Sequence, residues 1–440
     1  QQGGWQGEGN ESRQRTRQPG AQQANTETEL AACRTGQKLA KPHQLSVLAV
    51  TEPSAFLRLG LTSFGGPIAH LGYFRREFVE KRAWFSDSQY AQLVGLCQFL
   101  PGPASSQLGF SIGLLRAGLP GALAAFIAFT LPSALLLLVF ARIAPIMTGP
   151  VGLTILHGLK LVALAVVAHG VISMAQRLCP GLRHRLIAAG AAVLVVLATG
   201  AGTQIVVILL GALCGFLLLQ DGDSLPETGL PVSFSRKMAG WLIAIFLGLL
   251  VGLPLLRGLD HGLLAVFEAF YRAGALVFGG GHVVLPLLEE AVVTPGWLTR
   301  SDFMAGYGAA QAIPGPMFSF AAYLGAHLPE NLGGLVGATM ALSAIFLPGF
   351  LLVAAALPLW HVIAGHPQAI RAIGGINAAV VGLLAAALYD PVWTSAVHDV
   401  TDVGIAVVGF LMLAVGRFSA LIVVVWCLLA SGIASYLSFL

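Results

Sequence analysis

Four ionisable residues lie well inside long apolar stretches of the chain, namely Arg58, Lys160, Glu268 and Arg272. Charged groups in apolar surroundings are costly, so they usually have a functional partner. Glu268 and Arg272 are four residues apart with the acid first, which predicts a local ion pair on one helix. We therefore predict that Arg58 and Lys160 are the main countercharges for a bound anion, and that Arg272 contributes less. The alternative for Arg58 is that its side chain reaches the nearby aqueous interface.

Helix-breaking motifs interrupt the apolar stretches at Phe64-Gly65-Gly66-Pro67, Pro101-Gly102-Pro103, Phe278-Gly279-Gly280-Gly281 and Pro314-Gly315-Pro316. Glycine lets the backbone turn sharply, and proline removes a helix N–H donor. A half-helix that starts at such a break presents unpaired N–H groups and a partial positive charge, which together favour an anion. The predicted binding groups are the backbone, amide and hydroxyl groups of Gly65, Gly66, Gln98, Pro101, Gly102, Pro103, Ser105, Ser106, Gly279, Gly280, Gln311, Gly315 and Ser319. They would form a neutral cradle for a tetrahedral oxyanion, and the alternative is a kinked helix packed through glycine.

Two histidines, His70 and His282, lie just beyond the glycine breaks. We assign His282 to the anion site, and we assign proton coupling to His70 and Glu268. His157 and His169 also lie in apolar segments. A lone histidine in such a segment is usually a hydrogen-bonding strut, and we predict this role for both.

The helix-breaking motifs belong to an internal duplication. Phe56-Leu57-Arg58-Leu59-Gly60 matches Phe270-Tyr271-Arg272-Ala273-Gly274 at an offset of 214 residues, and the two Pro-Gly-Pro motifs are offset by 213. Further pairs are Leu131-Pro132 with Leu347-Pro348, and Gly158-Leu159-Lys160 with Gly375-Ile376-Asn377. Duplicated apolar segments with glycine and proline breaks are typical of membrane transporters built from two repeats.

The composition indicates a membrane protein. Of 440 residues, 56% are hydrophobic and 10% are charged, with a mean hydropathy of +0.80, whereas soluble domains have about 25% charged residues. Predicted spans lie near 119–143, 151–176, 186–201, 203–219, 239–256, 333–360, 369–389, 403–416 and 418–437. The net charge of +4 is too small and too scattered to indicate nucleic-acid binding. The five cysteines form no CxxC pair or metal-ligand cluster, and the chain has no flavin, nicotinamide or haem motif, so we predict no cofactor, no metal and no enzymatic activity.

Loop charges predict that the second copy is inverted. Residues 75–87 of the first copy sum to +1 and the matching residues 289–302 sum to −2, while residues 177–185 sum to +3 and residues 390–402 sum to −3. Basic residues favour the cytoplasmic side of short loops, so the sign reversal implies opposite orientations. One extra crossing at 239–256 would invert the second half. A count of 13 spans is one solution, but it conflicts with the charge of 75–82, so we favour re-entrant hairpins at the breaks.

The predicted organisation has four parts. Residues 1–50 form a disordered cytoplasmic tail, because they are polar and lack apolar periodicity. Residues 51–220 are the first repeat, 221–260 are a linker with one transmembrane helix, and 261–440 are the second repeat. The fold class is an all-α polytopic membrane protein with two inverted repeats and Gly/Pro-broken helices.

The motifs resemble those of the chromate ion transporter family. The resemblance rests on Phe64-Gly65-Gly66-Pro67, Gln98-Phe99-Leu100-Pro101-Gly102-Pro103, Phe278-Gly279-Gly280-Gly281-His282, Gln311 with Pro314-Gly315-Pro316, and the run from Arg75 to Asp87 that contains Trp84. It covers roughly residues 54–437. It implies a multi-pass protein of the bacterial inner membrane that exports chromate and confers chromate resistance, using the membrane potential or an exchanged ion. The chain departs from symmetry at Gly281, where the first copy has Pro67.

The expected activity is therefore secondary active efflux of a tetrahedral dianion by alternating access. The absence of a GxxxxGK[ST] motif agrees with this expectation. The alternatives are a carrier or exchanger of sulfate or molybdate, an anion channel, and a scaffold subunit. The expected partners are chromate or sulfate as the transported anion and the lipid bilayer, with a homodimer as an open alternative to a monomer.

Overall fold

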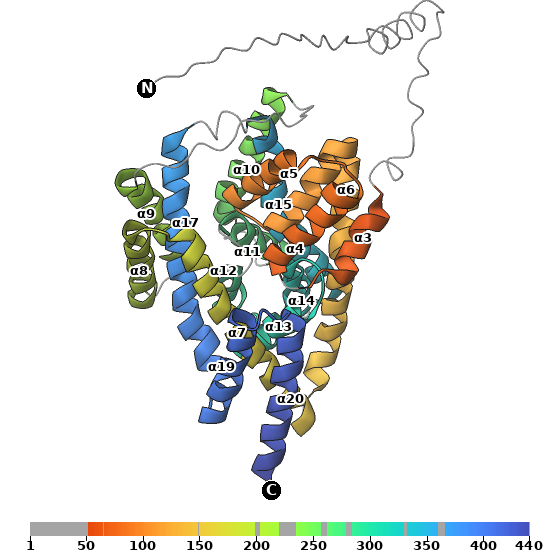
Figure 1. Cartoon of the computed structure of the whole chain (residues 1–440), viewed down its shortest axis with the longest axis vertical. Coiled ribbons are helices and arrows are strands. Elements are labelled where there is room, and N and C mark those ends of the chain that lie inside the picture. The colour runs from red at the N-terminus through yellow and green to blue at the C-terminus, as the bar shows by residue number, and fades with distance from the viewer. Residues whose placement is uncertain are drawn as a thin grey trace, which may run out of the picture. The chain divides into compact units, whose positions relative to one another are not determined.

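The computed structural model describes residues 52–64, 66–147, 149–198, 203–219, 235–256, 262–278, 284–329, 332–359 and 366–439 (Figure 1). The predicted tail and much of the linker lie outside these residues, as do the candidate site residues Gly65, Gly279, Gly280 and His282. The described residues contain helices and no strand. This confirms the prediction of an all-α polytopic membrane protein.

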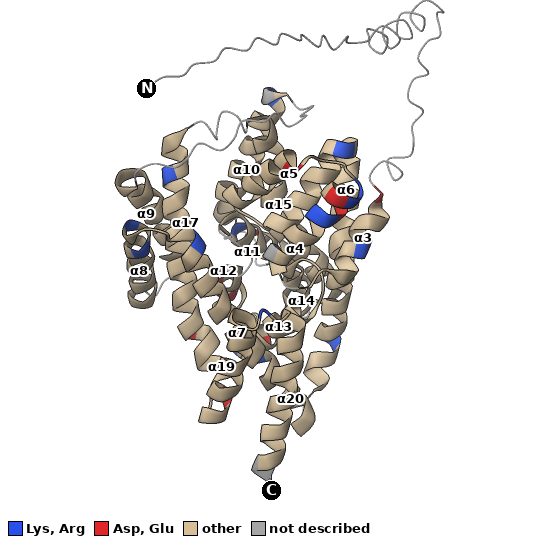
Figure 2. Cartoon of the chain, in the orientation of Figure 1, with Lys and Arg blue, Asp and Glu red and all other residues tan. Residues whose placement is uncertain are grey.

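Six described helices are long and apolar enough to cross a membrane. They are α6 (Ala104–Ile143), α7 (Pro150–Leu178), α10 (Arg236–Leu256), α15 (Gly334–Ala356), α17 (Pro367–Ala387) and α20 (Ala420–Phe439). Three other predicted spans are the shorter helices α8 (Leu182–Leu197), α9 (Thr203–Leu218) and α19 (Val400–Ala414). With 16, 16 and 15 residues, they fall short of the roughly 20 that a full crossing needs. Charged residues are sparse along the long helices (Figure 2).

The first glycine break lies at the tip of a re-entrant hairpin made by α3 (Pro53–Thr62) and α4 (Gly66–Arg75). The π-helical turn η1 (Arg76–Lys81) follows α4, and Arg82 then forms an ion pair with Glu52 at the start of α3. Phe56 of α3 packs on Phe78 with ring centroids 4.8 Å apart. The chain therefore enters and leaves on one side, which we call the first face.

A second hairpin carries the first Pro-Gly-Pro motif at its tip. It descends through α5 (Asp87–Phe99), which starts with a capping box at Ser86, and returns through the first part of α6. Arg116 lies over the Trp84 ring at 4.6 Å, so this hairpin also begins and ends at the first face. Residues Ala117 and Gly118 then leave helical geometry. A Cβ on Gly113 would overlap the carbonyl of Gly121, which shows that α6 reverses direction there.

After this turn, residues 119–143 of α6 cross to the opposite side, the second face, and α7 returns. Helices α8 and α9 form a hairpin that closes on itself, since Arg183 donates to the Leu218 carbonyl at 2.6 Å. The single helix α10 then crosses again. The second repeat consequently starts from the second face, and Figure 1 shows α3 in the upper half of the molecule and the C-terminus at its lower end.

The second repeat reproduces these hairpins with α11 (Leu263–Ala275), α12 (Val284–Val292), α13 (Arg300–Ala312) and α14 (Phe320–Ala326). At the second face, Arg300 at the start of α13 forms ion pairs with Glu289 of α12 at 3.1 Å and with Asp390 at 2.7 Å. Matching glycines set the packing of both repeats: Gly60 lies against the Phe129 carbonyl and Gly274 against the Ile345 carbonyl. The structure thus has re-entrant hairpins rather than 13 full spans.

Candidate functional site

The four helix breaks meet through two crossed hydrogen bonds. The backbone N–H of Gly102 donates to the Val277 carbonyl at 2.6 Å, and that of Gly315 donates to the Ser63 carbonyl at 2.9 Å. Both glycines have positive φ, +119° and +101°, which residues with a side chain rarely adopt. Each Pro-Gly-Pro loop therefore docks on the glycine break of the other repeat.

Buried polar side chains surround the first glycine break. Ser133 Oγ lies 2.7 Å from Ser319 Oγ and donates to the Thr130 carbonyl at 2.9 Å, and His70 Nε2 lies 3.2 Å from the Ser63 carbonyl. We call Ser63, His70, Thr130, Ser133 and Ser319 the first-break cluster, and all five are at most 2% exposed. Within the described structure, Ser63 Oγ, His70 Nδ1 and Thr130 Oγ1 have no hydrogen-bond partner. Buried groups of this kind are costly, at about 1–3 kcal/mol each, unless a ligand or water satisfies them.

The second glycine break is lined differently. The repeat offsets pair Ser63 with Val277, His70 with Val284, Thr130 with Phe346 and Ser133 with Gly349. Apolar or small residues thus replace the polar groups. The space beside Gly349 is filled by Gln107, whose Nε2 donates to the Pro101 and Gly349 carbonyls at 2.8 and 3.1 Å. The cluster of hydroxyl and imidazole groups therefore belongs to the first break, while Gln107, whose Oε1 is buried without a partner in the described structure, is a polar side chain beside the second.

Most predicted cradle residues lie at the crossed breaks. The buried ones are Pro101, Gly102, Pro103, Ser105, Ser106, Gln311, Gly315 and Ser319. Gly66 begins α4 with φ +77°, which places the start of this half-helix at the break. Ser106 Oγ is buried without a hydrogen-bond partner in the described structure, and Gln311 Nε2 lies 3.1 Å from Met317 Sδ.

Arg58 and Lys160, the two predicted countercharges, differ in their exposure and in their surroundings. Arg58 shares the exposed face of α3 with Leu57 and Leu61, away from the buried side that packs on α6. The structure does not bring Arg58 to the breaks, which favours the interface alternative. Lys160 is half-buried in α7, and Asp302 of α13 acts on it electrostatically. Asp302 belongs to the other repeat and forms no ion pair with Lys160 in the described structure, so the role of Lys160 as a countercharge stays a prediction.

The predicted ion pair in the second repeat is present. Arg272 Nε lies 2.8 Å from Glu268 Oε1, and Glu268 is buried. Arg272 also lines a small cavity together with Glu290 and Gln204. Glu268 therefore neutralises this arginine, and the smaller part of Arg272 in holding an anion stays a prediction.

Three residues of the first-break cluster were not predicted from the sequence, namely Ser63, Thr130 and Ser133. A signal for them exists: Ser63 precedes the Phe-Gly-Gly-Pro motif, and Thr130 and Ser133 flank the duplicated Leu-Pro pair. Polar residues beside repeated helix breaks would have identified them.

The two Pro-Gly-Pro hairpins differ in how they pack. Residues 303–311 of α13 are buried throughout, and α13 packs on α7 and α20. Its counterpart α5 packs on α6 and α15 and leaves Gln98 exposed, whereas the matching Gln311 is buried. A Cβ on Gly308 would overlap the Leu159 carbonyl, while a Cβ on the matching Gly95 would meet nothing within 4 Å. Helix α13 is therefore packed more tightly against its neighbours than α5 is.

Inverted repeats, re-entrant helices and a buried polar site at crossed breaks define a membrane transporter of the inverted-repeat class. The chromate transporter family model matches residues 53–216 and 264–435, and the chain belongs to this family. A chromate transport protein of Cupriavidus metallidurans is 28% identical over 345 residues, covering 76% of this chain and 80% of that protein. A chromate transport protein of Pseudomonas aeruginosa is 26% identical over 396 residues, 87% of this chain and 91% of that protein. An uncharacterized transporter of Methanocaldococcus jannaschii is 24% identical, with 76% and 81% covered. No solved structure matches the chain.

Proposed function

We propose that the protein is a secondary active transporter that exports chromate from the cytoplasm across the bacterial inner membrane and so confers chromate resistance. The family and the names of the similar proteins support chromate as the substrate. The observation that carries the proposal is the first-break cluster, where unpaired hydroxyl and imidazole groups are buried beside two helix breaks.

The proposed anion site uses neutral donors and helix ends. Helix α4 starts at Gly66, directly after the first glycine break, and the turn Met317–Ser319 before α14 follows the second Pro-Gly-Pro motif, which docks at the same break. Their first N–H groups and dipoles favour a dianion without a fixed ion pair. The hydroxyl groups of Ser63, Thr130 and Ser319 would add hydrogen bonds to its oxygens. Lys160, half-buried in α7, would contribute positive charge from a distance.

The proposed transport cycle follows from the unequal hairpins. The described state has α13 packed on α7, and Gln98, near the first Pro-Gly-Pro motif, exposed. In the opposite state, by the repeat symmetry, α5 would close on α17 near Ile376 and α13 would leave Leu159. The site would then open to the second face. This exchange of equivalent contacts is the expected behaviour of inverted repeats.

We propose that the first face is cytoplasmic, which also places the N-terminus there. The first-face segments 75–87 and 177–185 are basic overall, and the second-face segments 289–302 and 390–402 are acidic. Single cysteines at the exposed positions Arg76 and Thr299, in a cysteine-free background, test this assignment. A membrane-impermeant thiol reagent added to intact cells should label only the Thr299 position. Labelling of the Arg76 position alone would reverse the transport direction that we propose.

Chromate uptake into everted membrane vesicles tests the function. Uptake should saturate with chromate concentration and depend on an ion gradient or on the membrane potential. Sulfate or molybdate should inhibit it only if they bind the same site. Ser319→Ala should weaken apparent affinity about tenfold, the equivalent of 1.4 kcal/mol. Ser431→Ala is the matched control, since Ser431 is also a buried serine but lies in α20. Non-saturating flux without coupling would instead indicate an anion channel.

A further inference from the structure

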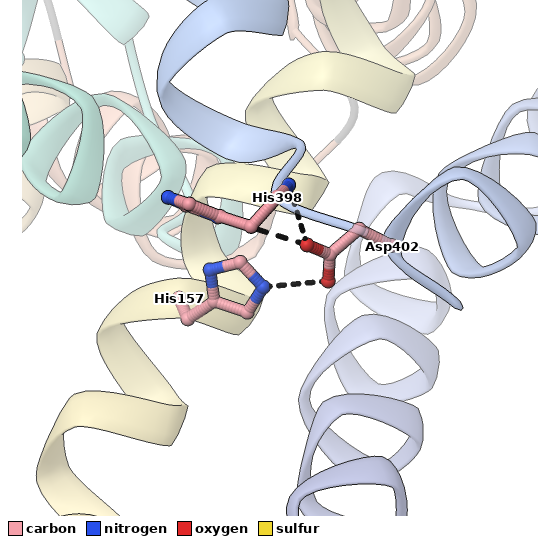
Figure 3. Close-up of side chains that lie close together, drawn as sticks. All are labelled: His157, His398 and Asp402. Carbon is pink, nitrogen blue, oxygen red and sulfur yellow. Dashed lines mark hydrogen bonds and ion pairs between the residues drawn. The ribbon is translucent and has the colours of Figure 1, made fainter. Parts of the chain in front are cut away.

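Two histidines and an aspartate meet near the second face, away from the crossed breaks (Figure 3). His157 lies on α7, in the first repeat. His398 and Asp402 lie at the start of α19, in the second. His157 Nε2 is 2.7 Å from Asp402 Oδ1, and His398 Nδ1 is 3.7 Å from Asp402 Oδ2. One ligand atom from each residue lies within 4.8 Å of the others.

The aspartate is held in place before any ligand arrives. Asp402 is buried, and its Oδ2 accepts a hydrogen bond from the His398 backbone N–H at 2.9 Å. The backbone N–H of Asp402 donates to Asp399 Oδ1, also at 2.9 Å, as part of the cap of α19. His157 is half-buried, whereas the His398 side chain is 63% exposed. The arrangement thus has two ordered ligands and one that faces the aqueous side.

We propose that His157, His398 and Asp402 bind a divalent transition-metal ion of the zinc class. Two imidazoles and one carboxylate are a donor set that Zn²⁺ and neighbouring metals prefer, and three protein ligands leave a further position for water. Ca²⁺ and Mg²⁺ are disfavoured, because they take oxygen ligands. An oxyanion is also disfavoured, because the carboxylate would repel it. The sequence did not predict this site, since its ligands are separated by 245 residues.

A metal bound here would join the two repeats at α7 and α19. The equivalent packing on the first-face side, between α8 and α17, is also extensive. The α7–α19 contact therefore belongs to the part of the molecule that is alike in both halves, not to the unequal hairpins. The bound ion would hold α7 and α19 together and would leave α13 free to move away from α7. This inference does not depend on chromate being the substrate.

Metal content tests the site directly. The full chain is purified in detergent with an affinity tag other than polyhistidine, equilibrated with Zn²⁺, dialysed, and analysed for zinc per chain. Wild type should retain one more zinc ion than Asp402→Asn. His398→Ala is the main variant, because its exposed side chain is not needed for folding. It should weaken Zn²⁺ binding at least about tenfold, as measured by competition with a chelator.

The matched control is His184→Ala, which removes a histidine at the start of α8. It should bind Zn²⁺ like wild type. Thermal unfolding gives a second readout: Zn²⁺, but not Mg²⁺, should raise the midpoint of wild type and His184→Ala. Equal zinc content in wild type and His398→Ala would overturn the proposal. If Zn²⁺ did not change the unfolding midpoint of wild type, the proposal would also be overturned. The cluster would then be only a histidine–aspartate ion pair.

Discussion

The unequal packing of Gly308 and Gly95 gives the sharpest prediction. A Cβ at Gly308 would lie closer than 3.0 Å to the Leu159 carbonyl, so Gly308→Ala must push α13 away from α7. Overpacking of this kind costs about 1–3 kcal/mol, which shifts a two-state equilibrium about 5- to 150-fold. We expect Gly308→Ala to favour the state that is open to the second face. Gly95→Ala costs nothing in the described state and should hinder only the opposite one.

Thiol accessibility measures this shift. In a cysteine-free background, a cysteine at the exposed position Gln98 should react readily with a hydrophilic maleimide, and one at the buried position Gln311 should react slowly. Gly308→Ala should speed the reaction at 311 and slow it at 98, whereas Gly95→Ala should do the reverse or leave both at their starting rates. Both variants should transport more slowly at normal abundance. If Gly308→Ala left both reaction rates and transport unchanged, the reasoning about alternating contacts would be refuted.

Three further predictions concern the breaks and the charges. Gly102→Ala should abolish transport, because its φ is +119° and a Cβ would lie 2.9 Å from Gln107 Nε2; uptake and membrane abundance are measured together. Arg272→Gln should destabilise the protein by about 3–5 kcal/mol, because it leaves the buried Glu268 carboxylate without its arginine. The double variant Glu268→Gln with Arg272→Gln should lower the midpoint of thermal unfolding less than Arg272→Gln alone. Burial raises the pKa of Glu289, outside the spanning helices, to about 7. Because the folded pKa exceeds the unfolded one, stability should fall by roughly 3 kcal/mol at most as the pH rises from 4.5 to above 7. Glu289→Gln should flatten this pH dependence of unfolding.

Much of the fold follows from local sequence features. Apolar length predicts the long helices, and the Gly-Gly and Pro-Gly-Pro motifs mark breaks that the structure contains. The spacing of Glu268 and Arg272 predicts their ion pair, because four residues make one helical turn. The start of a predicted span at residue 119 matches the reversal of α6 at Ala117 and Gly118.

The rest depends on contacts between distant segments. The electrostatic influence of Asp302 on Lys160 arises from the packing of α13 on α7, which no local sequence pattern specifies. The hydroxyl groups of Thr130 and Ser133 come to the first break because α6 passes behind α3, which no local pattern specifies. Helices α8, α9 and α19 have 16, 16 and 15 residues, close to the lengths of the apolar stretches in the sequence, which are too short for a full crossing.

The crossed hydrogen bonds also bear on how the chain is made. During synthesis, the N–H of Gly102 enters the membrane before its acceptor, the Val277 carbonyl, has been translated. The Ser63 carbonyl likewise has no donor until the N–H of Gly315 has been synthesised. An unpaired backbone group in lipid has a high free-energy cost. The first repeat should therefore stay incompletely folded, with these groups bound to water or to the insertion machinery. The centre of the molecule would then fold last, once the second Pro-Gly-Pro loop has left the ribosome.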